Sequence, residues 1–287
     1  MAQPPIRHIG TFAAIAAAVF FTATIGMVKL AAEMGAIGIL GIRITGTTFL
    51  LTLFLQVFFP SEASSLTVSL RSNPRLILLA TGCIGTGFFL FAWAFLHGYG
   101  TSVAQAYLLF PFSMVFGGLM FFGERLRRHQ WAGVCMAAIG VIHDLWVHTS
   151  LSWVTWVQAF VMTAYFLLHR VLHSRGVTSL QLLVGEFWLL MPLACICVVT
   201  QIERIQPFTT SLEGVFVIIG LWFITTLAYI SYIVSNQYLS CAAFGMWGSL
   251  EPILILSSSV LFFDAHIESG DLFTYVPMFL GSLLVVL

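Results

Sequence analysis

Long runs of apolar residues, separated by short polar breaks, follow one another along the whole chain. The run from Ser102 to Phe122 contains no charged residue and has about the 20 residues that an α-helix needs to cross roughly 30 Å of hydrocarbon. Comparable runs on either side predict ten transmembrane helices. Their ranges are Ile9–Leu30, Ile37–Phe59, Leu76–His97, Ser102–Phe122, Trp131–Val147, Leu151–His169, Leu180–Val199, Val215–Ser235, Ala242–Phe263 and Leu272–Leu287.

The composition agrees with this pattern and excludes a soluble globular domain. Of 287 residues, 60% are hydrophobic and 8% are charged, and the mean hydropathy is +1.01. Soluble domains carry about a quarter of charged residues. The sequence therefore predicts an all-α integral membrane protein, and its net charge of zero offers no basic face for nucleic acid. We interpret the first apolar run as a retained span, because it is longer than the core of a signal peptide.

Arginine residues predict the orientation of the spans. Clustered arginines in short loops hold those loops in the cytoplasm. With the N-terminus inside, the outer loops contain only Lys29 and Arg204, and most of the basic residues are cytoplasmic. Both termini are therefore expected on the cytoplasmic side. The basic residues placed there are Arg7, Arg71, Arg75, Arg125, Arg127, Arg128, Arg170 and Arg175.

The two halves of the chain share a motif, which predicts an internal repeat. In the first half, Pro111 lies in a span that Gly123-Glu124 closes; in the second, Glu251-Pro252 precedes Phe263-Asp264 by a similar distance. We therefore divide the chain into residues 1–148 and 149–287, with five spans each. Because five is odd, the second unit enters the membrane inverted relative to the first, which is the architecture of secondary transporters.

Two charged residues lie inside predicted spans, where charge is costly and is usually functional. Arg43 lies in the second span and Glu186 in the seventh, which is its counterpart in the second half. The helical neighbours of Glu186 are leucines, so it needs a partner from another helix. We expect both side chains to face the interior of the bundle, with a direct or water-bridged pair between them left open, and a purely structural role equally open.

Further candidates surround the two prolines that interrupt spans. Pro111 removes a backbone hydrogen bond in mid-span, which favours a neighbouring polar cavity. Glu251 precedes Pro252, where its carboxylate could bind a cation or a proton, and Gln105 is a weaker candidate. Aromatic rings inside the spans could line a pocket for a flat or cationic solute. Those proposed for the cavity are Trp93, Tyr107, Tyr165, Tyr232 and Trp247.

No catalytic or metal-binding pattern is recognisable. The cysteines lie in apolar runs without metal-ligand spacing, and no nucleophile and base stand at a workable spacing. We therefore expect no cofactor, no metal and no enzymatic activity. The expected partners are a small-molecule solute, the lipid bilayer, and protons or another coupling ion, and the oligomeric state stays open.

The run Phe122–Trp131, FGERLRRHQW, resembles the RarD branch of the EamA transporter family within the drug/metabolite transporter superfamily. The similarity extends along most of the chain, including Arg43, Trp93-Ala94, Tyr107 to Pro111 and EFWLL at Glu186–Leu190. This resemblance implies ten helices as two inverted EamA repeats, a bacterial inner-membrane location, and movement of small metabolites or drugs, for which export is the direction we expect. It also implies that the third, fourth, eighth and ninth helices line the central cavity.

The leading hypothesis is a secondary transporter that works by alternating access, with the solute bound at mid-membrane. Proton coupling through Glu186 or Glu251 would fit this function. A non-transporting membrane subunit or sensor is the main alternative and predicts no continuous cavity between the halves. An intramembrane enzyme is a third, for which the spans show no converging set of polar groups.

Overall fold

The computed structural model describes residues 4–147, 152–254 and 269–286, and every regular element within these ranges is helical. The helices are α1 (Pro4–Leu30), η1 (Ala32–Met34, a 3-10 turn), α2 (Gly35–Phe58), α3 (Pro60–Ser72), α4 (Pro74–Leu96), α5 (Gly100–Phe121), α6 (Arg128–Val147), α7 (Trp153–Ser174), α8 (Ser179–Thr200), α9 (Ile202–Thr210), α10 (Leu212–Tyr238), α11 (Cys241–Gly248) and α13 (Ser269–Val286). A helical segment also covers residues 250–254.

Short polar sequences fix where these helices begin. Pro60 and Pro74 occupy the first turns of α3 and α4, where a missing backbone N–H costs nothing and the fixed φ favours a helix. Serine or threonine hydroxyls cap other helices by accepting a bond from a backbone N–H of the first turn. Thr178 caps α8 in this way and Ser240 caps α11. The polar breaks that the sequence shows between apolar runs therefore contain the residues at which helices begin.

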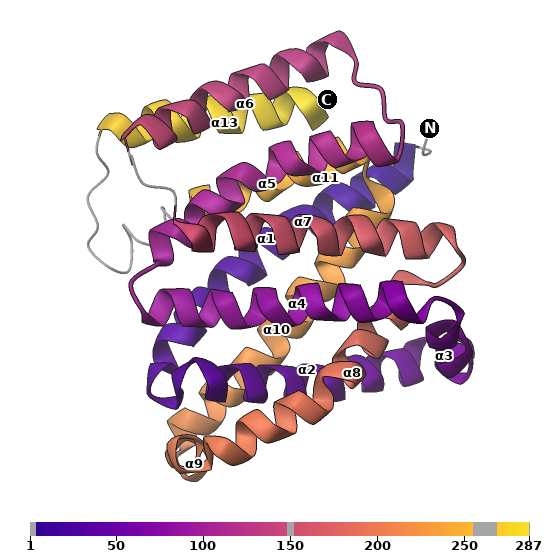
Figure 1. Ribbon diagram of the computed structural model, residues 1–287, viewed down its shortest axis with the longest axis vertical. Coiled ribbons are helices and arrows are strands. Elements are labelled where there is room, and N and C mark those ends of the chain that lie inside the picture. The colour runs from indigo at the N-terminus through magenta and orange to yellow at the C-terminus, as the bar shows by residue number, and fades with distance from the viewer. Residues whose placement is uncertain (1–3, 148–151, 255–268, 287) are drawn as a thin grey trace.

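The long helices run roughly side by side across the molecule, with α6 and α13 at one end and α9 at the other (Figure 1). Both chain termini lie on the same side of this view, together with the turns that join α3 to α4, α5 to α6 and α7 to α8. Most of the arginines of the sequence lie in or next to these three turns. The corner between α1 and α2 lies on the opposite side.

Seven of the described helices are long and apolar enough to cross a membrane, and they are α1, α2, α4, α5, α6, α8 and α10. The sixth predicted span, α7, is not among them, because it carries polar residues such as Gln158, Thr163 and His169. All three of these side chains are buried, so the polar face of α7 points into the bundle. The tenth predicted span corresponds to the shorter helix α13, and the part of the ninth predicted span that follows Leu254 lies outside the described residues. The count of exactly ten spans is therefore not confirmed.

Two short helices lie where the sequence predicts only breaks. Helix α3 has no buried residue and α9 buries only Ile205. Short helices of low overall hydrophobicity between two spans are typical of segments that lie along a membrane surface. The apolar-run criterion missed them because neither helix is hydrophobic enough to stand out.

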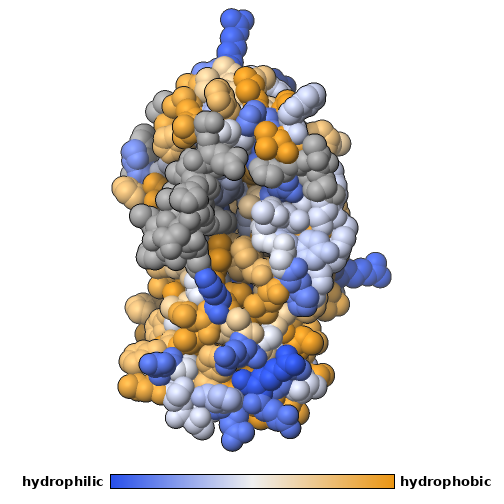
Figure 2. Space-filling model, turned by 90° about the vertical axis from the view of Figure 1, so that its left-hand side faces the viewer, coloured by the Kyte–Doolittle hydropathy of each residue, from blue (hydrophilic) through white to orange (hydrophobic). Residues whose placement is uncertain are grey.

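Large apolar side chains cover the flanks of the bundle, including Phe12, Phe160 and Phe216, each more than 60% exposed. Figure 2 looks onto the side opposite the termini; hydrophilic residues gather at its lower end, with hydrophobic residues along both lower edges. This distribution is expected if the hydrophilic lower part of this side contacts water and the hydrophobic edges contact lipid. Close helix crossings rely on glycine, as at α6 and α13, where a Cβ on Gly133 would lie 2.5 Å from the Gly281 oxygen.

Candidate functional site

Aromatic rings from four helices meet in the centre of the bundle. The Phe21 ring of α1 contacts Phe91 of α4 at 4.9 Å between centroids, Tyr107 of α5 at 5.5 Å and Tyr232 of α10 at 5.8 Å. All four side chains are buried. Their arrangement is mostly edge-to-face, the geometry that aromatic pairs prefer. The cluster provides π-faces and ring hydroxyls at the point where both halves of the chain meet.

Arg43 lies beside this cluster and is 1% exposed. Its Nε donates to the Thr225 hydroxyl at 3.2 Å, and its guanidinium carbon lies 4.6 Å from the centroid of the Phe88 ring. Its Nη1 has no hydrogen-bond partner among the described residues. Gly46, one turn along α2, allows α2 to pack closely on α10, because a Cβ there would meet the Trp222 ring. The guanidinium is thus held by aromatic rings and one hydroxyl, and part of its hydrogen-bond donor capacity is unused.

Glu186 is bonded to His169, which the sequence analysis had not selected. His169 Nε2 lies 3.1 Å from Glu186 Oε2 and 3.2 Å from Oε1, and the two side chains are 1% and 0% exposed. The Tyr165 ring lies 4.5 Å from the His169 ring. The pair ties α7 to α8 in the interior.

The structure thus gives the two intramembrane charges different partners, and the direct Arg43–Glu186 pair that the sequence left open does not form. The physical reason is the position of α7, whose polar face brings His169 to the carboxylate. A histidine at the predicted end of the sixth span reads as an interfacial residue, so only the packing of α7 reveals this contact. Gln158, in the middle of the same predicted span, was also not among the predicted site residues.

Glu251 is also buried, at 1% exposure, but its Oε2 atom has no hydrogen-bond partner among the described residues. It follows an interruption of the helix: α11 ends at Gly248, Ser249 forms a turn, and the helix resumes at Leu250. The Ser249 hydroxyl stabilises the turn by donating to the Met246 oxygen at 2.6 Å. Pro252 comes directly after Glu251 and lies in the resumed helix. Ser249 keeps right-handed helical dihedral angles, with φ of −68° and ψ of −10°, so the turn is a local departure from the helix and not an unwound segment.

Other buried polar atoms near the centre are also without partners among the described residues. They include the Tyr107 hydroxyl, Trp247 Nε1, Gln158 Oε1 and the Tyr165 hydroxyl. Most buried polar side-chain atoms in proteins make a hydrogen bond, so each such exception needs an explanation. Gln105 differs from these, because its Oε1 accepts from the Thr155 hydroxyl at 3.4 Å. Each of these atoms, like Glu251 Oε2, has hydrogen-bonding capacity that the described residues leave unused.

The remaining predicted residues occupy other places. Trp93 belongs to an aromatic stack with His97 at 4.6 Å, Tyr99 at 5.4 Å and Trp153 at 5.8 Å, at the end of α4. Pro111 lies within α5, which continues from Gly100 to Phe121. Gly245 of α11 allows a close approach there, because a Cβ on it would lie 3.1 Å from the Pro111 oxygen.

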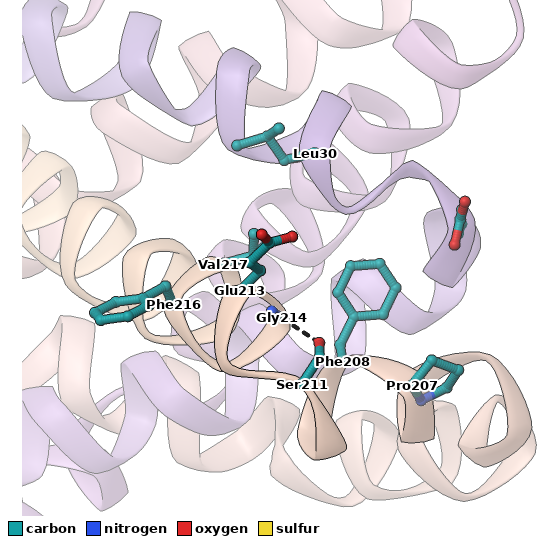
Figure 3. Close-up of a pocket in the computed structure, with 9 residues that line it drawn as sticks. Leu30, Pro207, Phe208, Ser211, Glu213, Gly214, Phe216 and Val217 are labelled. Atoms are coloured by element: carbon teal, nitrogen blue, oxygen red, sulfur yellow. Dashed lines mark hydrogen bonds between the residues drawn. The ribbon is translucent and has the colours of Figure 1, made fainter.

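A separate pocket of about 510 Å³ lies on the surface at the corner of η1, α9 and α10 (Figure 3). It is lined by Leu30, Glu33, Pro207, Phe208, Ser211, Glu213, Gly214, Phe216 and Val217. Ser211 caps α10 at its edge by accepting from the Gly214 N–H at 3.1 Å. None of the predicted site residues lines it. Among the described residues, no three His, Cys, Asp or Glu side chains converge as metal ligands would.

Comparison with known proteins decides the family. The sequence model of the EamA-like transporter family matches residues 8–143. An uncharacterized transporter from Haemophilus influenzae is 30% identical over 241 residues, which cover 83% of this chain and 79% of that protein. The chain belongs to the EamA-like transporter family. The chloramphenicol-sensitive protein RarD of Pseudomonas aeruginosa is 33% identical over 195 residues, 68% of this EamA chain and 64% of that protein, so the match spans less than two thirds of this relative.

The RarD protein of Escherichia coli is also similar, with 24% identity over 90% of this chain and 87% of that protein. These relatives confirm the RarD branch of the EamA family that the sequence indicated. A crystal structure of a protein aligns with 100% of this chain and 99% of its own, with a TM-score of 0.68 and 15% identity, which shows the shared fold alone. The EamA chain is thus a multi-pass membrane protein, and its family and several of its relatives, such as the protein from Haemophilus influenzae, are named as transporters.

Proposed function

We propose that this EamA chain is a secondary transporter of the bacterial inner membrane that exports a small solute by alternating access between two inverted repeats, residues 1–148 and 149–287. The helix contacts support this division. Helix α1 packs on α10, and their counterparts α7 and α4 pack on each other; α2 packs on α8, α5 on α11 and α6 on α13. This pattern maps onto itself when the two halves are exchanged, as a pseudo-twofold axis requires.

The proposed orientation has both termini in the cytoplasm. The arginine-rich turns lie on the same side of the bundle as the two termini. Basic residues in short loops stay in the cytoplasm. Under this orientation the turns after α3, α5 and α7 are cytoplasmic, and the corner between α1 and α2 is periplasmic.

The observation on which the solute site rests is the buried carboxyl group of Glu251, unpartnered among the described residues. No charged side chain that the structure describes makes a hydrogen bond to its Oε2 atom. A carboxylate in this environment is stable only when a proton or a cation neutralises it, since an isolated buried charge costs many kcal/mol. Tyr107 and Tyr229 lie within electrostatic range of it. A carboxylate beside aromatic rings is the chemistry that recognises an organic cation.

We therefore propose an organic amine or ammonium compound with an apolar or aromatic body as the solute. In the empty protein Glu251 holds a proton, and the incoming cation replaces it. Export of the cation is then coupled to entry of a proton. Glu186, already bonded to His169, takes no part in this exchange.

The test uses the purified full chain and a panel of aromatic amines and quaternary ammonium compounds, with neutral and anionic compounds of matched size. A ligand that binds only the folded form stabilises it by RT ln(1 + [L]/Kd), so thermal unfolding detects binding. We expect cationic members to raise the melting temperature, and Glu251→Gln to abolish the rise. Glu203→Gln, an exposed acid-to-amide change on α9, is the matched control and should keep it.

Flux and proton release complete the test. A quaternary ammonium compound that stabilises the protein should be transported by proteoliposomes, and its binding should release protons into weakly buffered solution from wild type but not from Glu251→Gln. Equal stabilisation by neutral or anionic compounds would contradict the cation site. Binding without flux by folded, reconstituted protein would contradict transport and favour a sensor.

A further inference from the structure

Glu124 holds the N-terminus of α11 from the other half of the chain. Its Oε1 accepts from the Cys241 N–H at 2.6 Å, and its Oε2 accepts from the Ala242 N–H at 3.3 Å. These are two of the backbone donors that have no partner within their own helix. A carboxylate at this end also interacts favourably with the helix dipole.

The sequence around Glu124 is built to deliver this carboxylate. Gly123 has φ of +60°, which turns the chain back after α5, and the Glu124 N–H donates to the Gly118 oxygen at 3.0 Å. Gly118 also leaves space for the side chain, because a Cβ there would lie 2.7 Å from Glu124 Oε2. The absence of a side chain at Gly118 is therefore required by the contact.

Arg170 of α7 extends the contact to the end of α10. Its Nη1 lies 3.6 Å from Glu124 Oε1, its Nε donates to Asn236 Oδ1 at 2.8 Å, and its Nη2 donates to the Leu239 oxygen at 2.6 Å. Asn236 in turn donates to the Phe166 oxygen at 3.1 Å. One network thus joins the turn after α5 to α7, α10 and α11.

We propose that Glu124, Arg170 and Asn236 form a latch that closes the solute path on the side of the α5–α6 turn and opens in each transport cycle. The inference rests on the proposed transport function and names the positioning residues that control access to its site. The latch joins the first half of the chain to the second at the start of α11, the helix whose interruption precedes Glu251.

Exposure distinguishes this network from the internal ion pair. The Arg170 and Glu124 side chains are 15% and 19% exposed, whereas His169 and Glu186 are almost fully buried. Water can replace the contact between Glu124 and Arg170, so its net contribution is modest and it can break and re-form, whereas Asn236 is 3% exposed and stays within the second half of the chain. Water cannot replace the hydrogen bonds between His169 and Glu186, because both side chains are almost fully buried. The latch is therefore suited to a reversible closure.

Cys241 reports on the latch, because it lies directly under Glu124 and is 0% exposed. The experiment measures its labelling rate by N-ethylmaleimide in the reconstituted full chain, with Cys83, Cys135, Cys195 and Cys197 replaced by serine. The reagent crosses membranes, so the result does not depend on sidedness. We expect Glu124→Gln and Arg170→Gln each to raise the rate about tenfold, the effect of losing one charge-assisted hydrogen bond, and the double variant to add little more.

Two controls separate a latch from a loosened fold. Arg175→Gln removes an exposed bond from the same end of α7, to Asn73, and should leave the rate unchanged. Ser102, at the other end of α5, is 7% exposed, and a Ser102→Cys reporter is made with Cys241 also replaced by serine. Its labelling should stay constant in the latch variants. Arg170→Lys, which keeps the charge but loses the planar fork, serves if Glu124→Gln does not fold.

Unchanged labelling of Cys241 in folded variants would overturn the latch, and so would equal increases at Cys241 and Ser102→Cys, which indicate general loosening around a static helix cap. The expected labelling pattern in a protein that transports none of the cationic compounds would keep the latch as a closure while removing the proposed function. The two failures are therefore distinguishable.

Discussion

Two carboxyl groups of the second half are equally buried but have opposite surroundings. Glu186 is 0% exposed and both of its oxygens lie within hydrogen-bond distance of His169. Glu251 is 1% exposed and its Oε2 has no hydrogen-bond partner among the described residues. The first lies in a continuous helix, α8, and the second directly after the turn at Ser249 that interrupts a helix.

The difference shows how burial alone fails to identify a functional charge. A paired charge is balanced within the protein, and removing either partner leaves the other uncompensated. An unpaired buried charge destabilises the fold until a ligand or a proton neutralises it. Stability lost at Glu251 is therefore what a cationic solute could recover on binding. The same chemical change at the two positions should have opposite effects on stability.

The largest effect is expected from Glu186→Met, which leaves His169 without its partner. Leaving one member of a buried hydrogen-bonded pair unsatisfied costs about 1–3 kcal/mol, and more when that member is charged, so the melting temperature in detergent should fall strongly. Replacing both residues, as His169→Leu with Glu186→Met, should recover most of this loss because no polar group stays uncompensated. A double variant that is no more stable than the single one would contradict the view that this pair is a structural clamp.

A smaller effect of opposite sign is expected from Glu251→Met, which removes a buried polar group that has no partner. The gain in unfolding free energy should be about 1–3 kcal/mol, measured by the same thermal unfolding. The variant should also lose stabilisation by aromatic amines. A clear decrease in stability would show that Glu251 has a structural partner, and would move it from the solute site to the framework.

The smallest effect is expected from Tyr107→Phe, which removes a buried hydroxyl that makes no hydrogen bond to the described residues. Stability should change by less than about 1 kcal/mol, because no bond is broken. Affinity for a cationic solute should fall by up to about tenfold if the hydroxyl bonds the ligand. Thr155→Val is the contrasting variant, since it removes a hydroxyl that bonds the Ser102 oxygen at 3.0 Å and should destabilise the protein.

The sequence predicted the long helices well where apolar composition decides the outcome. The runs that became α2, α4, α5, α8 and α10 were located to within a few residues, because a segment in lipid must satisfy its own backbone hydrogen bonds. Helices α3 and α9 escaped this criterion, since they are short and only weakly apolar. The interior position of Arg43, Glu186 and Glu251 also followed from their place within apolar runs.

What the sequence could not predict is which charge meets which partner. Arg43 contacts Thr225 across 182 positions of the chain, and Glu124 reaches α11 across 117. Such contacts depend on how helices are arranged laterally, and a pattern of apolar and polar residues along one helix is silent on that arrangement. His169 was overlooked for this reason, although its helix was predicted.

The chain by itself therefore determined a multi-pass helical membrane protein, because the bilayer imposes helix length, apolar composition and loop charge one segment at a time. Its resemblance to the EamA family rests instead on motifs such as FGERLRRHQW. Only the tertiary structure decided that Glu186 is bonded to His169, that Glu251 Oε2 lacks a hydrogen-bond partner among the described residues, and that Glu124 caps α11. The physical reason is that a buried charge is stabilised by atoms within a few ångströms of it, and here those atoms belong to other helices.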